Sequence, residues 1–298
     1  MARTKSLNIQ LNGSTEKEQL AEVYGSVVDN VALTAVSVAL KNNNLSGDPA
    51  GGSVEVKRFT NAVAKAYGTA RGAGKGDVLK AEPVTVNLNT HKEIVEEFEG
   101  FDVVKYGVPS LVAKRAGNHV ETMDRDLDSA FFACAVKEGF SFTATKTKKV
   151  QVLEELVAAI EGTKNDYVDG VDRADIAVTL SVNWASELRN ELDELPNGME
   201  YKNGIIGQLH GFDVYTSNRL PEGVNCVAMR YESIAQPCMI SQYKAEKVNL
   251  SNATAAELFY DYGTKAVTAD LVRYIGTPAG TESEGTESAG TESEGTEE

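Results

Sequence analysis

Apolar residues recur at three- and four-residue steps along much of the chain, and this period predicts amphipathic helices. The longest such segment runs from about 109 to 137 and ends before Gly139. At 1.5 Å per residue such a helix is roughly 40 Å long. Its weakest point is Gly117–Asn118, where it could break in two. Its apolar face consists of Val120, Met123, Leu127, Phe131 and Cys134.

Three further helices follow from the same period and from helix-end signals. One is expected from about 16 to 41, opened by a capping-box pattern and closed by asparagines. A second ends at Gly162, and a third is capped by Ser181 and stops before Pro196. The last two flank a short apolar strand at Asp175–Leu180, an order typical of an α/β region.

Strand-like alternation opens and closes the segment from Val54 to Leu88, as VEVKRF and VTVNLN. Between these runs lies GTARGAGKGD, with glycines at 68, 72, 74 and 76. A tip so rich in glycine cannot pack a core of its own. The pattern therefore predicts a long hairpin with a flexible glycine end that projects from the body.

A second strand pair is predicted at Gly204–His210 and Phe212–Ser217, turning on Gly211. Glycine accepts backbone angles that other residues resist, so it suits such a hinge. With the neighbouring helices, this pair places residues 149–240 in an α/β region. Further ordered segments are expected at Val227–Tyr231, Met239–Tyr243, Glu257–Tyr262 and Ala266–Tyr274.

Composition narrows the class of protein. A chain of 298 residues can bury a sizeable core, and no run of about 18 apolar residues predicts a membrane-spanning helix. The N-terminal segment lacks the apolar stretch of a signal peptide. The three cysteines are widely spaced and odd in number, which argues against a disulfide framework. These features favour synthesis in a reducing cytoplasm.

The charge is strongly acidic. The formal net charge is −15, and residues 280–298 hold seven glutamates and no basic residue. That tail repeats the units TESEG and TESAG, and without large apolar side chains we expect it to be disordered. Binding of nucleic acid through counterion release needs clustered Lys and Arg, so tight DNA binding is not expected.

The sequence RGAGKGD at 71–77 superficially resembles a phosphate-binding loop. A Walker loop would need glycine where Thr69 stands and Ser or Thr where Gly76 stands. A dinucleotide fingerprint would need glycine in place of Asp77. The segment is better interpreted as a mobile hairpin tip.

The histidines and cysteines form no metal-binding pattern. His91, His119 and His210 stand far apart without zinc-ligand spacing, and Cys134 lies on the apolar helix face as a small core residue. No G-x-S-x-G elbow is present, and no Ser or Cys has a recognisable base partner. We therefore expect no catalytic residue, no metal ligand and no cofactor.

The acidic stretch ETMDRDLDS, with Asp124, Asp126 and Asp128, superficially resembles a calcium loop. The glycine that follows the third acid in such loops is missing, and helical periodicity continues through the segment. Alternate acids on a helix point in different directions. A solvated helix face or contacts between subunits are the expected roles of these carboxylates.

The segment G-F-D-V-Y-x-S-N-x-L-P, within residues 211–221, resembles part of the major capsid proteins of tailed bacteriophages. These proteins have the Hong Kong 97-type fold, which they share with encapsulins. The likeness covers most of residues 15–276 as an order of elements and about 175–221 as sequence. It implies an α+β fold with an N-arm, an extended E-loop hairpin, a P-domain with a long spine helix, and an A-domain.

The resemblance also implies a division of the chain. The expected parts are the N-terminal arm and helix at 1–50, the E-loop hairpin at 51–95, the P-domain with its spine helix at 96–148, the A-domain at 149–240, a return to the P-domain at 241–277, and the disordered acidic tail at 278–298. By the same resemblance, the E-loop tip contacts neighbouring subunits. That tip consists of Gly68, Arg71, Gly72, Gly74, Lys75 and Gly76.

The function implied is that of a major capsid protein, a subunit that self-assembles into an icosahedral shell around the double-stranded DNA genome of a tailed phage. Its partners would be further copies of itself, in pentamers and hexamers, together with a scaffolding protein and a portal. DNA would be enclosed without sequence-specific binding, and no membrane would be involved. The protein would be located in the virion, and in the host cytoplasm during assembly.

Three alternatives stay open. An encapsulin-like nanocompartment would share the fold but package enzymes instead of DNA. An α/β enzyme could hold a scattered active site, since catalytic triads need not be close in sequence. A tail-tube or decoration protein would lack the long helix at 109–137.

Overall fold

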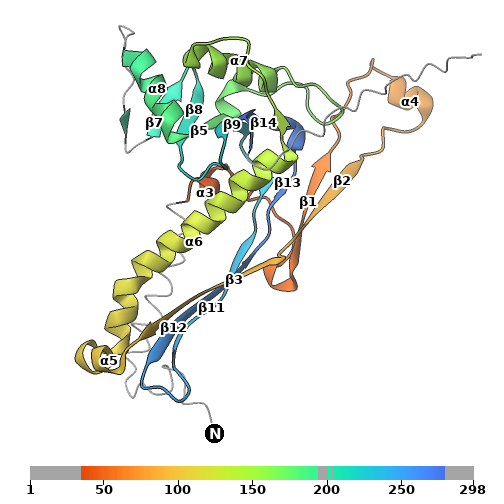
Figure 1. Cartoon of the computed structure of the whole chain (residues 1–298). Coiled ribbons are helices and arrows are strands. Elements are labelled where there is room, and N and C mark those ends of the chain that lie inside the picture. Colours follow the sequence, from red (N-terminus) through yellow and green to blue (C-terminus); the bar gives the residue numbers. More distant parts are fainter. Residues whose placement is uncertain (1–34, 194–200, 203–204, 279–298) are drawn as a thin grey trace, which may run out of the picture.

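The computed structural model describes residues 35–193, 201–202 and 205–278. A single long helix, α6 (Val108–Glu138), runs beside a narrow three-stranded sheet and meets a seven-stranded sheet at its C-terminal end (Figure 1). A two-stranded hairpin projects from the junction of these parts. The fold is therefore α+β, as the resemblance of residues 211–221 implies.

Helix α6 is 31 residues long and agrees with the predicted segment to within one residue at each end. Pro109 stands in its first turn, where a missing N–H costs nothing, and Gly139 caps its C-terminus. The helix continues unbroken through Gly117–Asn118. Its predicted apolar face is buried: Val120, Met123, Leu127, Phe131 and Cys134 are all core residues.

The three-stranded sheet is antiparallel, in the order β11 (Cys238–Lys247), β12 (Thr254–Tyr262) and β3 (Thr90–Phe98). Alternate side chains of β12 pack on one face of α6, because successive residues of a strand point to opposite faces. They are Ala256, Leu258, Tyr260 and Tyr262. A short helix, α5 (Gly100–Tyr106), joins β3 to α6 at the far end of this sheet (Figure 1).

The seven-stranded sheet is mixed, with strand order β4-β14-β9-β5-β8-β7-β6. Two neighbouring pairs, β5–β8 and β4–β14, are parallel. Helices α7 (Lys149–Glu161) and α8 (Val182–Asp193) share its main core. The strand bounds are β4 Phe140–Ser141, β5 Ile176–Leu180, β6 Tyr201–Lys202, β7 Ile205–Leu209, β8 Phe212–Thr216, β9 Val224–Arg230 and β14 Val272–Gly276.

The predicted strand pair around Gly211 is confirmed as the antiparallel hairpin β7–β8. His210 and Gly211 form its two-residue turn, and both have positive φ, at 48° and 97°. A turn of this hand matches the natural twist of the two strands. Ser181 also caps α8 as predicted, since its hydroxyl accepts the N–H of Trp184 at 3.4 Å.

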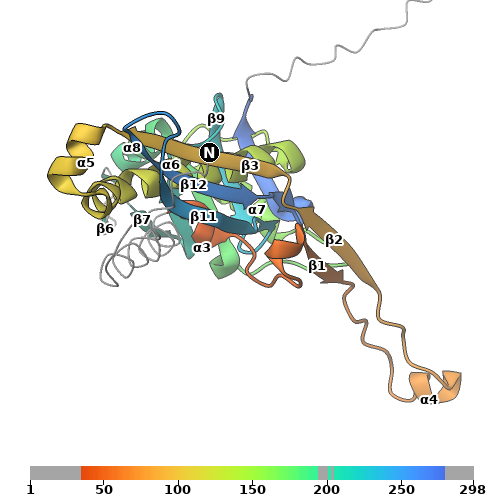
Figure 2. The same ribbon diagram turned by 90° about the horizontal axis from the view of Figure 1, so that it is seen from below.

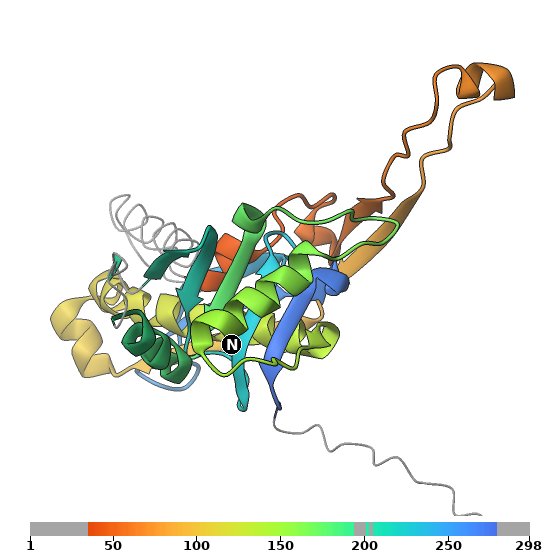
Figure 3. The same cartoon turned by 90° about the horizontal axis from the view of Figure 1, so that it is seen from above.

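The predicted long hairpin is confirmed as β1 (Ser53–Phe59) paired antiparallel with β2 (Ala81–Asn87). Figures 2 and 3 show its distal part extending well away from the body. The sequence predicts a flexible glycine end there and no helix, whereas residues Thr69–Ala73 form one short helix, α4. Alanine and arginine favour helix and glycine does not prevent a single turn.

Small elements connect these parts. They are α3 (Val36–Leu40), β10 (Ile234–Ala235), β13 (Lys265–Ala266) and the 3-10 turns Pro49–Gly51, Arg173–Asp175 and Ala269–Leu271. Of the helix predicted at 16–41, only residues 35–41 are described, and Val36–Leu40 is helical. The predicted extended arm, the stop before Pro196 and the acidic repeats lie outside them. Among described helices, none is long and apolar enough to cross a membrane.

Candidate functional site

The distal half of the long hairpin is the most exposed part of the described chain. Residues 61–69 and 72–83 are all exposed to solvent. Several of them are large and apolar, with Tyr67 at 99% and Val78 at 82% of full exposure. Val63 and Leu79 are exposed to a similar degree. Exposed apolar groups gathered on a projecting element indicate a surface for contact with another molecule.

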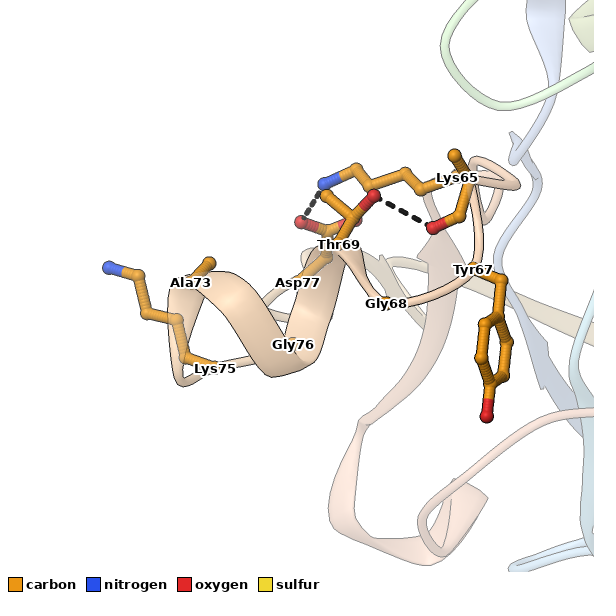
Figure 4. Close-up of a pocket in the computed structure, with 9 residues that line it drawn as sticks. Lys65, Tyr67, Gly68, Thr69, Ala73, Lys75, Gly76 and Asp77 are labelled. Atoms are coloured by element: carbon orange, nitrogen blue, oxygen red, sulfur yellow. Dashed lines mark hydrogen bonds and ion pairs between the residues drawn. The ribbon is translucent and has the colours of Figure 1, made fainter.

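The tip is closed by a few local contacts (Figure 4). The Lys65 ammonium lies 2.5 Å from the Asp77 carboxylate, joining the two arms of the hairpin. The Thr69 hydroxyl donates to the Ala66 carbonyl at 2.7 Å. Tyr67 points away from this ion pair, and Lys75 extends from the opposite side (Figure 4). Gly68 and Gly74 have positive φ, which explains glycine at both positions.

A shallow pocket at the tip is lined by residues of the same loop, Lys65–Thr69, Ala73 and Lys75–Asp77. Of the six tip residues singled out from the sequence, three line this pocket, namely Gly68, Lys75 and Gly76, and Gly74 precedes Lys75 in the chain. Gly72 and the backbone of Arg71 lie in the short helix beside it. No catalytic pairing is formed there by described side chains. A role of the tip as a contact surface between subunits stays a prediction.

The base of the hairpin, by contrast, is firmly attached. Val54, Val56 and Val86 are buried against Ala235 and Val267. This small core orients the two strands where they leave the body. The hairpin therefore projects from the body with its base packed and its distal end exposed to solvent.

Polar contacts reinforce the outer side of the base. Arg58 donates to the Asp270 carboxylate at 2.7 Å, and its guanidinium lies 4.3 Å from the centre of the Tyr167 ring. The Tyr167 hydroxyl donates to Glu82 at 2.9 Å. Burial favours a higher pKa for Asp270, but hydrogen bonds led by Arg58 outweigh it and lower the pKa. These contacts join both strands of the hairpin to loops of the seven-stranded sheet.

A second exposed apolar surface lies at the opposite end of the molecule. On α5, Phe101 and Val104 are largely exposed, and Leu250 in the nearby β11–β12 loop is fully exposed. The two segments touch, because a Cβ on Gly100 would overlap the side chain of Asn252. Figure 1 shows this end of the molecule far from the hairpin tip. One subunit cannot bring the two surfaces together.

The acidic stretch on α6 is not the solvated face that the sequence suggests. Asp124 and Asp128 are buried, and both accept hydrogen bonds from Arg219, at 3.0 and 2.9 Å. Asp128 also accepts the backbone N–H of Val36 and of Ser37. The prediction of a solvated face is wrong for these two residues because their partner, Arg219, lies about 90 residues away in sequence, beyond the reach of a local pattern. The alternative role, in contacts between subunits, stays a prediction.

His119 is also fully buried, on the same helix. Its Nε2 lies 3.0 Å from the Glu96 carboxylate and its Nδ1 lies 3.0 Å from the Tyr243 hydroxyl. Glu96 further accepts two hydrogen bonds from Arg115. The hydrogen bond from Arg115, helped by His119 and opposed by burial, lowers the pKa of Glu96 to about 2. This network attaches α6 to the three-stranded sheet.

The remaining candidate groups of the sequence make contacts within the subunit. Cys134 packs in the core, where burial raises the pKa of its thiol to about 12. His91 pairs with Asp261 at the surface and His210 pairs with Glu154. Within the described part of the chain, no three His, Cys, Asp or Glu side chains are arranged to hold a metal ion.

No family model and no curated protein matches the sequence. Solved structures do match the fold. A structure from Mycobacterium phage Che8 aligns with 76% of this chain and 84% of its own, with a TM-score of 0.57 and 18% identity. The capsid of cyanophage P-SCSP1u aligns with 80% of this chain and 86% of its own, with a TM-score of 0.58 and 12% identity.

A virus-like particle from Pyrococcus furiosus aligns over more of the chain, 86%, and over 98% of its own length, with a TM-score of 0.50 and 10% identity. The chain has the Hong Kong 97-type capsid fold. This confirms the fold that the resemblance at residues 211–221 implies.

Within this capsid fold, the residues quoted for the resemblance have identifiable roles. Phe212 and Val214 are buried in the main core of the seven-stranded sheet. Asp213 accepts a hydrogen bond from the Tyr231 hydroxyl at 2.5 Å. Ser217 accepts the backbone N–H of Arg219, whose side chain reaches α6. The segment is thus a structural element that joins the sheet to the long helix.

Proposed function

We propose that this protein is the major capsid protein of a tailed phage, a structural subunit that self-assembles into an icosahedral shell around double-stranded DNA. One observation carries the proposal beyond the fold. The long hairpin has a packed base, yet its apolar end is covered by nothing in the described part of its own chain. Exposed apolar patches mark sites of contact with other molecules, and in this proposal a neighbouring copy of the chain covers this one.

The division of the chain in this proposal follows the resemblance. Residues 51–95 serve as the E-loop, whose tip residues Gly68, Arg71, Gly72, Gly74, Lys75 and Gly76 contact neighbouring subunits. Residues 96–148 and 241–277 serve as the P-domain with α6 as its spine helix, and 149–240 as the A-domain. Extended arms of this kind produce obligate interfaces, typically above roughly 2,000 Å².

The proposed shell consists of pentamers and hexamers of this chain, assembled in the host cytoplasm with a scaffolding protein and a portal and present afterwards in the virion. A net charge of −15 suits a container that holds DNA without adhering to it. We assign the protein no catalytic activity and no cofactor.

An encapsulin-like nanocompartment is the second candidate, favoured by the likeness to the Pyrococcus furiosus virus-like particle. Both candidates predict closed shells, so the contents distinguish them. Nuclease-resistant DNA inside particles, together with a portal protein, supports the phage capsid. A folded cargo enzyme without DNA supports the nanocompartment.

Sedimentation of the full chain, expressed with its neighbouring structural genes, tests the proposal. We expect most of the protein in particles of uniform size, with treatment by nuclease leaving enclosed DNA intact. A protein that remains monomeric at all concentrations in the presence of scaffold and portal contradicts a shell function.

A further inference from the structure

Three segments that are distant in sequence meet at one buried ionic cluster. Arg219, from the turn after β8, donates to Asp124 and Asp128, which lie one helical turn apart on α6. Asp128 in turn accepts the backbone N–H groups of Val36 and Ser37, at 3.3 and 2.9 Å. Figure 1 shows α3 lying beside α6 at this level. The cluster therefore joins the first described residues, the long helix and the seven-stranded sheet.

The two carboxylates have unequal surroundings. The Asp128 side chain is fully buried and its oxygens receive three donors, so its negative charge is well compensated. One oxygen of Asp124, Oδ1, has no hydrogen-bond partner among the described residues although the side chain is buried. A buried charged oxygen without a donor is costly, and a second negative charge one turn away adds repulsion.

We propose that Arg219, Asp124 and Asp128 form a proton-sensitive latch, which tightens when Asp124 takes up a proton. Protonation removes the repulsion between the two carboxylates and leaves Arg219 to pair with the charge on Asp128. The latch then holds α3 and the Ser217–Pro221 turn more firmly to α6. The opposite change, loss of that proton, loosens both attachments together.

The direction in which pH acts on the latch follows from the surroundings of Asp124. Burial and then the charge of Asp128 raise the pKa of Asp124, and together they outweigh the opposing effect of Arg219. A carboxyl whose pKa is higher in the folded than in the unfolded chain stabilises the fold as it takes up a proton. Acidification therefore strengthens the latch over the range in which Asp124 titrates.

Few other charged side chains affect the pKa of Asp124. On α6, Glu121 adds a smaller repulsion, and it is paired with Arg125 at the surface. The Ser217–Pro221 turn contributes no charged side chain besides Arg219, and the segment Val36–Leu40 contributes none. The inference concerns contacts within one subunit, so it stands or falls independently of the proposed shell function.

Hydrogen exchange of the peptide that contains Val36–Leu40 tests the latch, with rates corrected for the intrinsic effect of pH. In the wild-type subunit we expect protection to rise as the pH is lowered from neutral to a mildly acidic value at which the subunit is still folded, because protonation of Asp124 removes its repulsion with Asp128. In Asp124→Asn, which removes the charge but keeps an acceptor, protection should be high at both pH values. Glu121→Gln is the matched control on the same helix and should keep the wild-type dependence.

Asp128→Asn should lower protection of that peptide about tenfold or more at every pH, since a charge-assisted hydrogen bond is worth about 1.5–3 kcal/mol. If this variant does not fold, the comparison of the wild type with Asp124→Asn is sufficient to test the latch. Protection that stays flat or falls on acidification of the wild type overturns the proposal. An unchanged pH dependence in Asp124→Asn overturns it equally.

Discussion

The guanidinium of Arg58, at the base of the projecting hairpin, lies 2.7 Å from the carboxylate of Asp270 beside the seven-stranded sheet. Both side chains are mostly buried. The pair spans more than 200 residues of sequence and fixes the direction in which the hairpin leaves the body. In the proposed shell that direction decides which neighbour the tip can reach.

Asp270→Asn should therefore loosen the hairpin without unfolding the subunit. Loss of the charge weakens a partly buried, charge-assisted hydrogen bond worth about 1.5–3 kcal/mol. We expect faster hydrogen exchange in β1 and β2 and slower assembly, measured by mass spectrometry and light scattering. Asp169→Asn is the control, because its exposed pair with Lys164 should contribute little. Equal effects of both variants would contradict a specific role for Asp270.

The exposed apolar residues of the tip provide a second prediction. Replacing Tyr67 and Leu79 together by serine should leave the melting temperature of the isolated subunit unchanged, because neither side chain is buried in it. Each side chain is worth about 1.5–3 kcal/mol when fully buried at an interface. The critical concentration for assembly should therefore rise at least about tenfold. A lowered melting temperature would instead mean that these residues stabilise their own subunit.

Deleting Gly68–Gly76 tests the tip as a whole. The deletion removes α4 and its glycines but none of the buried residues at the hairpin base. We expect a folded subunit with the same cooperative unfolding transition as the wild type and a severe loss of shell assembly. Removal of residues 279–298 is the matched truncation and should leave assembly intact. Normal particles from the tip deletion would refute the assignment of the tip as an interface.

The network of Glu96, His119 and Arg115 predicts a defined acid sensitivity. The pKa of Glu96 falls from 4.5 to about 2 on folding, so its contribution to stability is present above about pH 4.5 and is lost as the pH falls toward 2. Glu96→Gln should lower the free energy of urea unfolding at neutral pH by about 1–3 kcal/mol. The variant should also lose less stability than the wild type between those two pH values.

Glu93→Gln is the control for that experiment, since Glu93 is exposed on the same strand. It should change neither the stability at neutral pH nor its acid dependence. If Glu96→Gln behaves like this control, the network does not hold α6 to the sheet.

Local patterns in the sequence predicted the regular elements well. The periodicity of Val120, Met123 and Leu127 predicted α6 because these residues form one buried face. The alternation in VEVKRF and VTVNLN predicted β1 and β2, and Gly211 predicted the turn between β7 and β8. In each case the residues that determine the element lie within it.

Contacts between distant segments were not predictable in this way. Asp124 and Asp128 have the spacing of a solvated helix face, and only the folded chain brings Arg219 to them. Strand β3 is rich in glutamate and became a strand through pairing with β12, more than 150 residues later. Helix α4 was not predicted, because it is a single short turn and the glycines around it are a stronger signal for a loop. The division into domains and the role of the tip residues remain predictions.

Electron microscopy of particles purified from cells that express this chain with its scaffolding and portal proteins tests the central claim most directly. We predict closed icosahedral shells in which the hairpin of each subunit lies across a neighbouring subunit and covers Tyr67 and Leu79. Monomers alone, or an ordered assembly in which the hairpin tips remain exposed to solvent, would contradict the account.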